Sequence, residues 1–330
     1  MKKILVTGAA GFIGSHVVDE LIKMGHNVIA FDDLSGGFVD NVNEKAEFIE
    51  GSFLDLDLIN KVFSENNVTH IYHLGAYAAE GLSHFIRNFN YSNNLIGSIN
   101  LINAAINFKV KNFIFTSSIA VYGKNQLPYS EETIPNPEDP YGISKYAVEL
   151  DLKNAHEMFG LNYVIFRPHN VYGARQNIGD KYRNVIGIFM NSILKGDELS
   201  IFGDGNQTRA FSYIDGVALP IAHSGFLEKA QNQVFNIGAD KTYTINELVH
   251  VVGNAFNIAP KTKHYKARNE VVHAYSTHDK AKEVFSEYMK NIDLETGIGE
   301  MAKWVKVAGA KSTPKFENIE ILENLPNVWR

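Results

Sequence analysis

The chain has 330 residues, a hydrophobic content of 45% and a formal net charge of -6. A chain of this length and composition can bury a large core and is expected to form two domains, or one domain with an added lobe. The sequence contains no cysteine, which excludes disulfides, thiolate metal sites and a thiol nucleophile and is typical of a cytoplasmic protein. The charged residues form no basic cluster, which argues against nucleic acid as the main partner.

The apolar runs of the sequence are short. They fall far below the roughly 20 residues that a membrane-spanning helix needs. The N-terminus, MKKILVTG, passes directly into a strand-like run and then into glycines, whereas a signal peptide needs a longer apolar core and a small-residue cleavage site. We therefore expect no membrane segment, no export and a cytoplasmic location.

Short apolar runs alternate with helical patterns over the first half of the chain. Most of these runs are continuously apolar, as expected for parallel strands that are buried on both faces. The alternation predicts an α/β fold of the Rossmann type with a doubly wound parallel sheet. The expected strands are Lys3–Thr7, Val28–Asp32, Glu47–Glu50, His70–Leu74, Phe113–Ser117 and Tyr163–Arg167, and the helices between them include Gly14–Met24 and Asn93–Phe108.

The alternation stops after Tyr172, where the loop Gly173–Asn184 begins. Val234–Ile237 is another apolar run, which predicts that the chain returns to the sheet there. The last residues, roughly Ser312 to Arg330, are expected to be a peripheral tail. The other elements expected here are a helix at Val185–Lys195, a strand at Ser200–Phe202, a turn at Gly203–Asn206 and helices at Ile245–Phe256 and Asp279–Phe285.

Three glycines lie between the first strand and the first helix, in VTGAAGFIGSH. Gly8 permits a tight turn, Gly11 lets the backbone approach a pyrophosphate, and Gly14 allows the helix to pack closely on the strand. The amides at the start of that helix would face the phosphates. Asp32 ends the second strand and would accept hydrogen bonds from the adenosine ribose hydroxyls. A carboxylate there repels a 2′-phosphate, so NAD is favoured over NADP, with a glycine-rich turn that binds nothing as the alternative.

These features predict the division of the chain. Residues 1–172, with a return of about 211–240, are expected to form a Rossmann-type NAD-binding domain. Residues of about 173–210 and 241–330 are expected to form a smaller α/β lobe that binds the substrate.

Tyr141 and Lys145 lie four residues apart in DPYGISK, so they share one face of a helix. Asp139 and Pro140 are typical of an N-cap and a first helical position, which places Tyr141 in the first turn. Ser118, in TSSIAVYG, follows the fifth apolar run, at the carboxyl end of the sheet where such folds bind ligands. The three side chains of Ser118, Tyr141 and Lys145 are therefore expected to form one catalytic site.

The expected base is the phenolate of Tyr141. A free tyrosine titrates near 10, so action near neutrality requires its pKa to fall by about three units, or roughly 4 kcal/mol. One cation at about 4 Å, at an effective dielectric constant near 20, supplies about that much. We expect the ammonium of Lys145 to be this cation, helped by the positive nicotinamide ring and the helix dipole. The alternative, an ordinary surface pair, is disfavoured by the glycine loop and by Ser118.

Seven motifs resemble those of the extended short-chain dehydrogenase/reductase family, and within it the nucleotide-sugar epimerases, most like the UDP-glucose 4-epimerases. They are VTGAAGFIG, HLGA, TSSIAVYG, PYGISK, RPHNVYG, FGDGNQTRAFSYID and FNIG. The resemblance runs from Met1 to about Ala281. It implies that Tyr141 takes the proton of the sugar 4′-hydroxyl, that NAD accepts the C4 hydride, and that hydride returns to the opposite face of the keto sugar. Ser118 would bond the same oxygen, and Lys145 would also hold the nicotinamide ribose.

The resemblance also implies two sets of ligand-binding residues. The set for NAD is Gly8, Gly11, Phe12, Ile13, Gly14, Asp32, Ser52, Phe53, Leu74, Gly75, Ala76, Asn93, Tyr141 and Lys145. The set for the UDP-sugar is Ser118, Tyr141, Asn170, Asn184, Arg209, Arg268 and Glu270, in which the arginines would bind the diphosphate. The pair Ser52-Phe53 departs from the family's usual Asp-aliphatic pair at the adenine, although Asp55 lies nearby.

Further residues separate the branches of this family. Dehydratases have Asp-Glu after the serine, decarboxylases a glutamate, and 3,5-epimerases a cysteine at the second position, whereas this chain has Ile119 and Ala120. Neither side chain can move a proton, which favours simple 4-epimerisation. Ala274 stands where some members have a bulky tyrosine near the sugar C2 substituent, so UDP-N-acetylhexosamines are also expected to fit.

The predicted activity is the NAD-dependent 4-epimerisation of a UDP-hexose of the glucose/galactose type through a transient 4-keto intermediate. UDP-N-acetylhexosamines, UDP-uronic acids, UDP-pentoses and sugars of GDP or dTDP stay open as substrates. A keto-sugar reductase or dehydrogenase that turns over free NAD(H) is a second hypothesis. A regulator without activity is a third, disfavoured because Tyr141 and Lys145 are both present.

Two further expectations concern assembly and metals. The resemblance implies a homodimer that packs the helices Asn93–Phe108 and Tyr141–Phe159 of each subunit, although apolar positions such as Ile99, Ile102, Val148 and Leu152 fit an internal core equally well. His169, His273 and His278 do not have the spacing of a metal site, so no metal is expected.

Overall fold

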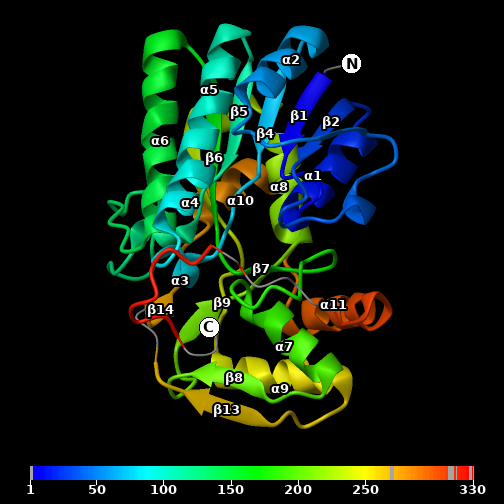
Figure 1. The fold of residues 1–330 in the computed structure, drawn as a ribbon, viewed down its shortest axis with the longest axis vertical. Coiled ribbons are helices and arrows are strands. Elements are labelled where there is room, and N and C mark those ends of the chain that lie inside the picture. Colours follow the sequence, from blue (N-terminus) through cyan, green and yellow to red (C-terminus); the bar gives the residue numbers. More distant parts are fainter. Residues whose placement is uncertain (1–2, 268–270, 311–315, 317, 327–328, 330) are drawn as a thin grey trace.

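The structure is a computed structural model that describes residues 3–267, 271–310, 316, 318–326 and 329. A parallel sheet of seven strands forms its upper part in Figure 1. The order β11-β6-β5-β4-β1-β2-β3 reverses between β1 and β4, and such a switch point creates a ligand-binding crevice at the carboxyl ends of the strands. The strands are β1 (Lys3–Thr7), β2 (Asn27–Asp32), β3 (Glu47–Glu50), β4 (His70–His73), β5 (Asn112–Thr116), β6 (Asn162–Pro168) and β11 (Gln233–Ile237). The Rossmann-type sheet is confirmed, including the return of the chain at β11.

Helices cover both faces of this sheet. On one face α1 (Phe12–Lys23) and α8 (Asp215–Ser224) pack with α10 (Asp279–Phe285) over a buried cluster. On the other face α2 (Leu56–Asn66), α5 (Gly97–Asn107) and α6 (Pro140–Phe159) bury a second cluster. The strands are apolar on both faces because both faces are covered.

The expected helix from Asn93 to Phe108 is more complex than its pattern predicts. A short helix α4 (Arg87–Tyr91) leads into a π-helical turn, η2 (Ser92–Ile96), before α5 begins. Inside this turn, Asn94 accepts a hydrogen bond from the backbone N–H of Tyr77 at 2.9 Å and donates one to the Tyr77 carbonyl at 3.1 Å. Single π turns within helices often occur at functional sites, and this one faces the crevice.

A smaller lobe lies at the carboxyl ends of the strands, with its own apolar cluster (Figure 1). Its larger elements are α7 (Val185–Lys195), β8 (Leu199–Phe202), α9 (Ile245–Phe256), β13 (Thr262–Tyr265) and α11 (Leu294–Ala308). The sequence reasoning missed α11, although Ile298, Met301, Ala302 and Val305 form a buried stripe at helical spacing. The short strands are β7 (Val171–Tyr172), β9 (Thr208–Ala210), β10 (Ser212–Tyr213), β12 (Thr242–Thr244) and β14 (His273–Ala274), and α3 (Glu80–Ser83) follows β4.

The fold bears on the expectations about the homodimer, the domain boundaries and membrane-spanning helices. Ile102, Val148 and Leu152 are buried in the core of the single chain, so they supply no evidence for a dimer. The homodimer and the domain boundaries stay predictions. Within the described residues, the structure contains no helix with the length and apolar character that a membrane span requires.

The C-terminal residues depart from the expected peripheral tail. Leu325 and Trp329 are each only 4% exposed and belong to an apolar cluster with residues near α3. The red end of the chain lies between the sheet and the smaller lobe (Figure 1). The prediction of a peripheral tail is therefore wrong for Leu325 and Trp329, whose side chains are buried, whereas Leu322, at 64% exposed, lies at the surface as a peripheral tail would.

Candidate active site

A cleft of about 1120 Å³ runs along the carboxyl ends of the strands and between the sheet and the smaller lobe. Pockets for one small ligand usually measure roughly 300–1,000 Å³. The cleft is therefore slightly larger than the usual pocket for one small ligand.

The glycine loop forms one end of the cleft. Gly8 has a φ of +69°, and a Cβ there would lie 2.6 Å from the backbone nitrogen of Gly75. A Cβ on Gly14 would collide with the carbonyl oxygen of Gly8, so the helix can approach the loop this closely only because residue 14 is a glycine. Gly11 is the N-cap of α1, whose first residues, Phe12 and Ile13, line the cleft. This arrangement fits a pyrophosphate held at a helix N-terminus.

Asp32 lies beside the glycine loop at the end of β2. Its carboxylate accepts hydrogen bonds from the backbone N–H of Ala10 at 3.0 Å and of Leu34 at 2.8 Å. Burial raises the pKa of Asp32, and the two backbone bonds lower it only in part. The side chain lines the cleft, and a carboxylate can accept about four hydrogen bonds. Lone pairs therefore remain for ribose hydroxyls.

Most of the other expected cofactor residues line the cleft, and Ser52 does not. Phe53, Leu74, Gly75, Ala76 and Asn93 line the cleft, as expected.

Ser52, in contrast, is not among the residues that line the cleft, and its role at the cofactor stays a prediction. Its hydroxyl accepts from the backbone N–H of Leu54 at 3.2 Å within the turn after β3. Asp55 caps α2 by accepting from the N–H of Leu58 at 3.0 Å. Both polar side chains next to Phe53 are therefore occupied by local backbone contacts.

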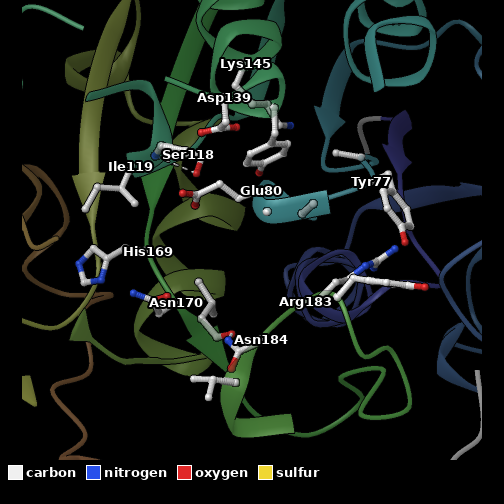
Figure 2. Close-up of a pocket in the computed structure, with 18 of the residues that line it drawn as sticks. Tyr77, Glu80, Ser118, Ile119, Asp139, Lys145, His169, Asn170, Arg183 and Asn184 are labelled. Atoms are coloured by element: carbon white, nitrogen blue, oxygen red, sulfur yellow. Dashed lines mark hydrogen bonds between the residues drawn. The ribbon is translucent and has the colours of Figure 1, made fainter. Parts of the chain in front are cut away.

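The three expected catalytic side chains meet in the cleft. Asp139 caps α6 by accepting from the N–H of Gly142 at 2.8 Å, with Pro140 in the first turn as predicted. The phenol of Tyr141 is hydrogen-bonded to the side chain of Ser118. Lys145 completes the group and is 2% exposed. Figure 2 shows Ser118 and Asp139 on one side of the cavity, with Asn170 and Asn184 across it.

The ammonium of Lys145 donates a hydrogen bond to the carbonyl of Thr116 at 2.8 Å. It lies 4.7 Å from the ring centroid of Phe115 and 5.9 Å from that of Tyr141. Burial lowers the pKa of Lys145 to about 7, although the charge of Glu149 opposes this change. Near neutral pH this group is therefore poised between its charged and neutral forms.

The electrostatics of Tyr141 differ from the expectation. Burial raises the pKa of Tyr141 well above its ordinary value, and the charges of Glu80 and Asp139 raise it further. The hydrogen bond to Ser118 lowers it only in part. Within the protein alone, burial therefore outweighs the lowering of the Tyr141 pKa that was expected from Lys145, and the expected help from the nicotinamide ring stays a prediction. The physical reason is that desolvation opposes charge on the phenol and on the ammonium alike.

A buried ion pair supports this site from behind. Glu149 accepts from Arg167 at 2.9 Å and at 2.5 Å, and from the hydroxyl of Ser117 at 2.5 Å. Arg167 also donates to the hydroxyl of Tyr122 at 2.7 Å. The pair links α6 to β6 and to the residue that follows β5, so it fixes the elements that carry the catalytic side chains. The sequence reasoning did not identify it.

Three expected substrate-binding residues face the cleft from its other side. Asn170 has a φ of +40° and donates to the carbonyl of Ala210 at 3.1 Å. Asn184 caps α7, accepting from the N–H of Ile186 at 2.9 Å. Arg209 donates to the carbonyls of residues 271 and 272 at 2.6 and 2.8 Å.

Each of these three side chains is thus oriented by backbone partners. The other two expected substrate-binding residues, Arg268 and Glu270, lie outside the described residues.

Several side chains in the cleft were not expected. Arg183 forms an ion pair with Asp180 at 2.9 Å, and its guanidinium lies 4.6 Å from the ring centroid of Tyr77 (Figure 2). Glu80 lines the cleft from α3, near enough to affect the pKa of Tyr141. A signal for Arg183 exists, because the sequence DKYRN is a charged run inside an otherwise unassigned loop. Tyr77, Glu80 and His84 have no local pattern that marks them, and Lys266 is a further unexpected lining residue.

The histidines make polar contacts of their own. The Nε2 atoms of His169 and His278 lie 3.0 Å apart, and Nδ1 of His278 lies 2.7 Å from a carboxylate oxygen of Asp240. His273 Nδ1 lies 2.8 Å from the hydroxyl of Thr208. In the part of the chain that the structure describes, no cluster of three histidine or carboxylate side chains could hold a metal ion.

The fold and the cleft define a dinucleotide-binding enzyme of the short-chain type. Residues 4–238 match the model of the NAD dependent epimerase/dehydratase family. The chain belongs to this family, which confirms the resemblance to the extended short-chain dehydrogenases/reductases, and its cofactor is NAD.

Known proteins resemble the chain over nearly its whole length. A putative UDP-glucose 4-epimerase of Methanocaldococcus jannaschii is 36% identical, over 92% of this chain and 98% of that protein. The structure of a UDP-glucose 4-epimerase of Thermotoga maritima with UDP-glucose has a TM-score of 0.87 at 36% identity, covering 93% of this chain and 99% of its own. A UDP-N-acetylglucosamine 4-epimerase of Methanobrevibacter ruminantium, solved with UDP-N-acetylmuramic acid, has a TM-score of 0.83 at 33% identity, covering 92% and 97%.

Proposed function

We propose that the protein catalyses the NAD-dependent 4-epimerisation of a UDP-hexose of the glucose/galactose type through a transient 4-keto intermediate. The observation that carries this proposal is the meeting of Ser118, Tyr141 and Lys145 in one cleft, between the glycine loop and Arg209. The names of the relatives from M. jannaschii and T. maritima support the same activity.

Each side chain has a separate role in the proposed reaction. The phenolate of Tyr141 takes the proton of the sugar 4′-hydroxyl, becoming the phenol, and later returns that proton, while Ser118 bonds the same oxygen. When bound, NAD would supply a reversible hydride acceptor and, in its oxidised form, a positive charge. Because burial raises the pKa of Tyr141, both that positive charge and the ammonium of Lys145 are needed to stabilise the phenolate. Arg209 would hold the diphosphate from the smaller lobe.

Elimination and decarboxylation are less well supported. The two residues after Ser118, Ile119 and Ala120, cannot move a proton. Glu80 reaches the cleft from a different element, and its negative charge raises the pKa of both Tyr141 and Tyr129. The carboxylate of a uronic acid would be repelled by Glu80. We therefore infer that a neutral hexose is preferred to a uronic acid.

A second substrate class is favoured by one residue. Ala274 lines the cleft in β14, in register with Arg209 of β9. Its small side chain leaves space for an N-acetyl group at the sugar C2 position. The M. ruminantium relative, named as a UDP-N-acetylglucosamine 4-epimerase, supports UDP-N-acetylhexosamines as additional substrates.

One experiment separates these alternatives. The purified protein is incubated with UDP-glucose, UDP-galactose, UDP-N-acetylglucosamine, UDP-xylose and UDP-glucuronic acid, and the products are resolved by chromatography. We expect the C4 epimers of UDP-glucose and UDP-galactose, no net NADH absorbance, and little product from UDP-glucuronic acid. A stoichiometric change in free NADH would instead establish a reductase or dehydrogenase and overturn the proposal. Inertness towards UDP-N-acetylglucosamine alone would remove the second substrate class.

A further inference from the structure

Phe316, residues 318–326 and Trp329, which we call the C-terminal strap, are tied to the loop and helix that follow α3. The carboxylate of Glu320 accepts from the backbone N–H of Asn88 at 2.7 Å and of Phe89 at 2.8 Å. The backbone N–H groups of Glu320 and Ile321 both donate to the carbonyl of Phe85, at 2.8 and 3.2 Å. These contacts join segments more than 230 residues apart in the sequence.

Aromatic contacts hold the strap at both of its described ends. The ring centroid of Phe316 lies 5.0 Å from that of Phe89 and 5.3 Å from that of Tyr77. At the other end, the ring centroid of Trp329 lies 5.4 Å from that of Tyr182. Trp329 and Leu325 share a buried cluster with Leu82 of α3. The strap therefore packs on both loops that flank the sugar side of the cleft.

The strap also faces the cleft itself. Its cleft-lining residues are Ile321, Glu323, Asn324, Pro326 and Trp329. Helix α3, on which Trp329 packs, carries Ser83, whose hydroxyl accepts from the backbone N–H of Tyr141 at 3.3 Å. The strap thus lies one helix away from the proposed base. Its described polar and aromatic contacts are with Tyr77, Phe85, Asn88, Phe89 and Tyr182, and none of these belongs to the glycine loop.

We propose that the C-terminal strap is the outer wall of the sugar compartment and determines which hexose substituents the enzyme accepts. The proposal rests on the proposed function, because it assigns the hexose to the side of the cleft nearest Tyr141. The strap lies beyond residues 4–238, which the family model matches. Loss of the strap should alter binding of the sugar nucleotide and leave binding of NAD unchanged.

Three variants test this wall. They are removal of residues 310–330, Glu320→Ala and Trp329→Ala. For each we expect the KM for UDP-glucose to rise about tenfold or more, with a smaller change in kcat and an NAD dissociation constant within about twofold of the wild type. The ratio of kcat/KM for UDP-glucose over UDP-N-acetylglucosamine should fall, because the wall no longer limits bulk.

Matched controls exist on α11. Val307 is 89% exposed, and Glu300 is paired only with its helical neighbour Lys303 in the contacts described, at 2.6 Å. Val307→Ala and Glu300→Ala should leave KM, selectivity and NAD binding unchanged. If the truncated protein folds and keeps the wild-type KM and selectivity, the proposal is overturned.

A direct readout uses the tryptophans, of which the chain has two. Trp304→Phe leaves Trp329 as the single tryptophan, and its emission should change when UDP-glucose is added to saturation. Trp329→Phe should lose this response. If Trp329 emission does not respond in a protein that turns over UDP-glucose, the strap does not border the sugar. This result decides the question even if the truncated protein fails to fold.

The two proposals fail in different ways. If wild-type protein turns over no UDP-sugar, the proposed function is wrong. In that case the affinity of UDP-glucose for the wild type and for Glu320→Ala, measured by calorimetry, tests the strap proposal separately. Equal affinities of the two proteins would overturn the strap proposal. If wild type is active and all three strap variants match it, the strap proposal alone is wrong.

Discussion

The two sides of the cleft are built in different ways. The side formed by the sheet consists of continuous motifs, in which the glycine loop, Asp32 and the helix that carries Tyr141 follow directly from strands. The opposite side collects single residues from β9, the start of α7, α3 and the C-terminal strap. Some of their side chains bond backbone groups of distant segments, as Arg209 bonds the carbonyls of residues 271 and 272.

The difference shows where chemistry is tied to local backbone conformation. On the sheet side, a positive φ or a close approach requires glycine, so the requirement is visible in the sequence. On the other side, the backbone conformation does not require a particular residue type. The side chains there are oriented by hydrogen-bond partners, whose positions depend on the tertiary fold. We therefore expect substitutions on the sheet side to affect chemistry or folding, and those opposite to affect substrate binding.

The largest effect should come from Tyr141→Phe. Loss of the proton-transferring hydroxyl should lower kcat by about 10³-fold, within the range of general acid–base catalysis. The affinity for NAD should stay within a few-fold, since the ring remains. Steady-state kinetics and NAD titration measure the two quantities. Tyr146→Phe, on the same helix but outside the cleft lining, is the control, and an active Tyr141→Phe enzyme would exclude Tyr141 as the base.

The buried ion pair should show the next largest effect. Arg167→Met leaves the carboxylate of Glu149 buried without its cation, and removal of one partner typically lowers the free energy of unfolding by about 3–5 kcal/mol. Urea unfolding followed by circular dichroism measures the change. The double variant Arg167→Met/Glu149→Leu should recover much of the loss, because no unpaired charge remains. Equal destabilisation by the single and double variants would contradict this account.

Arg209→Ala tests the opposite side of the cleft. Hydrogen bonds to charged groups contribute about 1.5–3 kcal/mol, so the KM for the UDP-sugar should rise about 10- to 100-fold. NAD binding should not change. Arg175→Ala, which removes an arginine paired with Asp19 outside the cleft lining, serves as the control. A fall in NAD affinity instead would show that the two sides of the cleft are not separable.

The smallest expected effect is the change in the free energy of unfolding per pH unit that is due to Lys145. Burial lowers its pKa from 10.5 to about 7, so between these values the unfolded chain binds a proton that the folded protein does not. Stability of the protein stripped of NAD should therefore rise with pH across that window, by at most about 1.4 kcal/mol per unit. Lys145→Met should remove this slope, and Lys303→Met, an exposed control, should keep it. Urea unfolding at pH 6, 8 and 9.5 measures the slope, and a wild-type slope retained in Lys145→Met would assign it to another group.

Much of the fold could be predicted because its signals are local. The apolar runs gave β1 and β3 with their observed ends, and the periodicity of Val185–Lys195 and Ile245–Phe256 gave α7 and α9. Ser52 was assigned to the cofactor by motif position, yet its hydroxyl bonds the adjacent turn. A motif places a residue along the chain, and its hydrogen-bond partners decide whether it reaches the cleft.

The electrostatics could not be predicted in the same way. The four-residue spacing correctly places Lys145 on the same helix as Tyr141, but it says nothing about burial or about the carbonyl of Thr116, which accepts the ammonium's hydrogen bond. Glu80 also affects Tyr141 from a separate helix. These effects act through space, and the residues responsible are distant in sequence.

The sequence by itself determined the parallel sheet, the glycine loop and the placing of Ser118, Tyr141 and Lys145 as candidate catalytic side chains, because each depends on periodicity or on backbone conformations that few residues adopt. Only the tertiary structure decided the ionisation of Tyr141, the partners of Arg209 and the position of the C-terminal strap in the cleft wall. Those properties depend on desolvation and on contacts between segments tens to hundreds of residues apart, which no local pattern encodes.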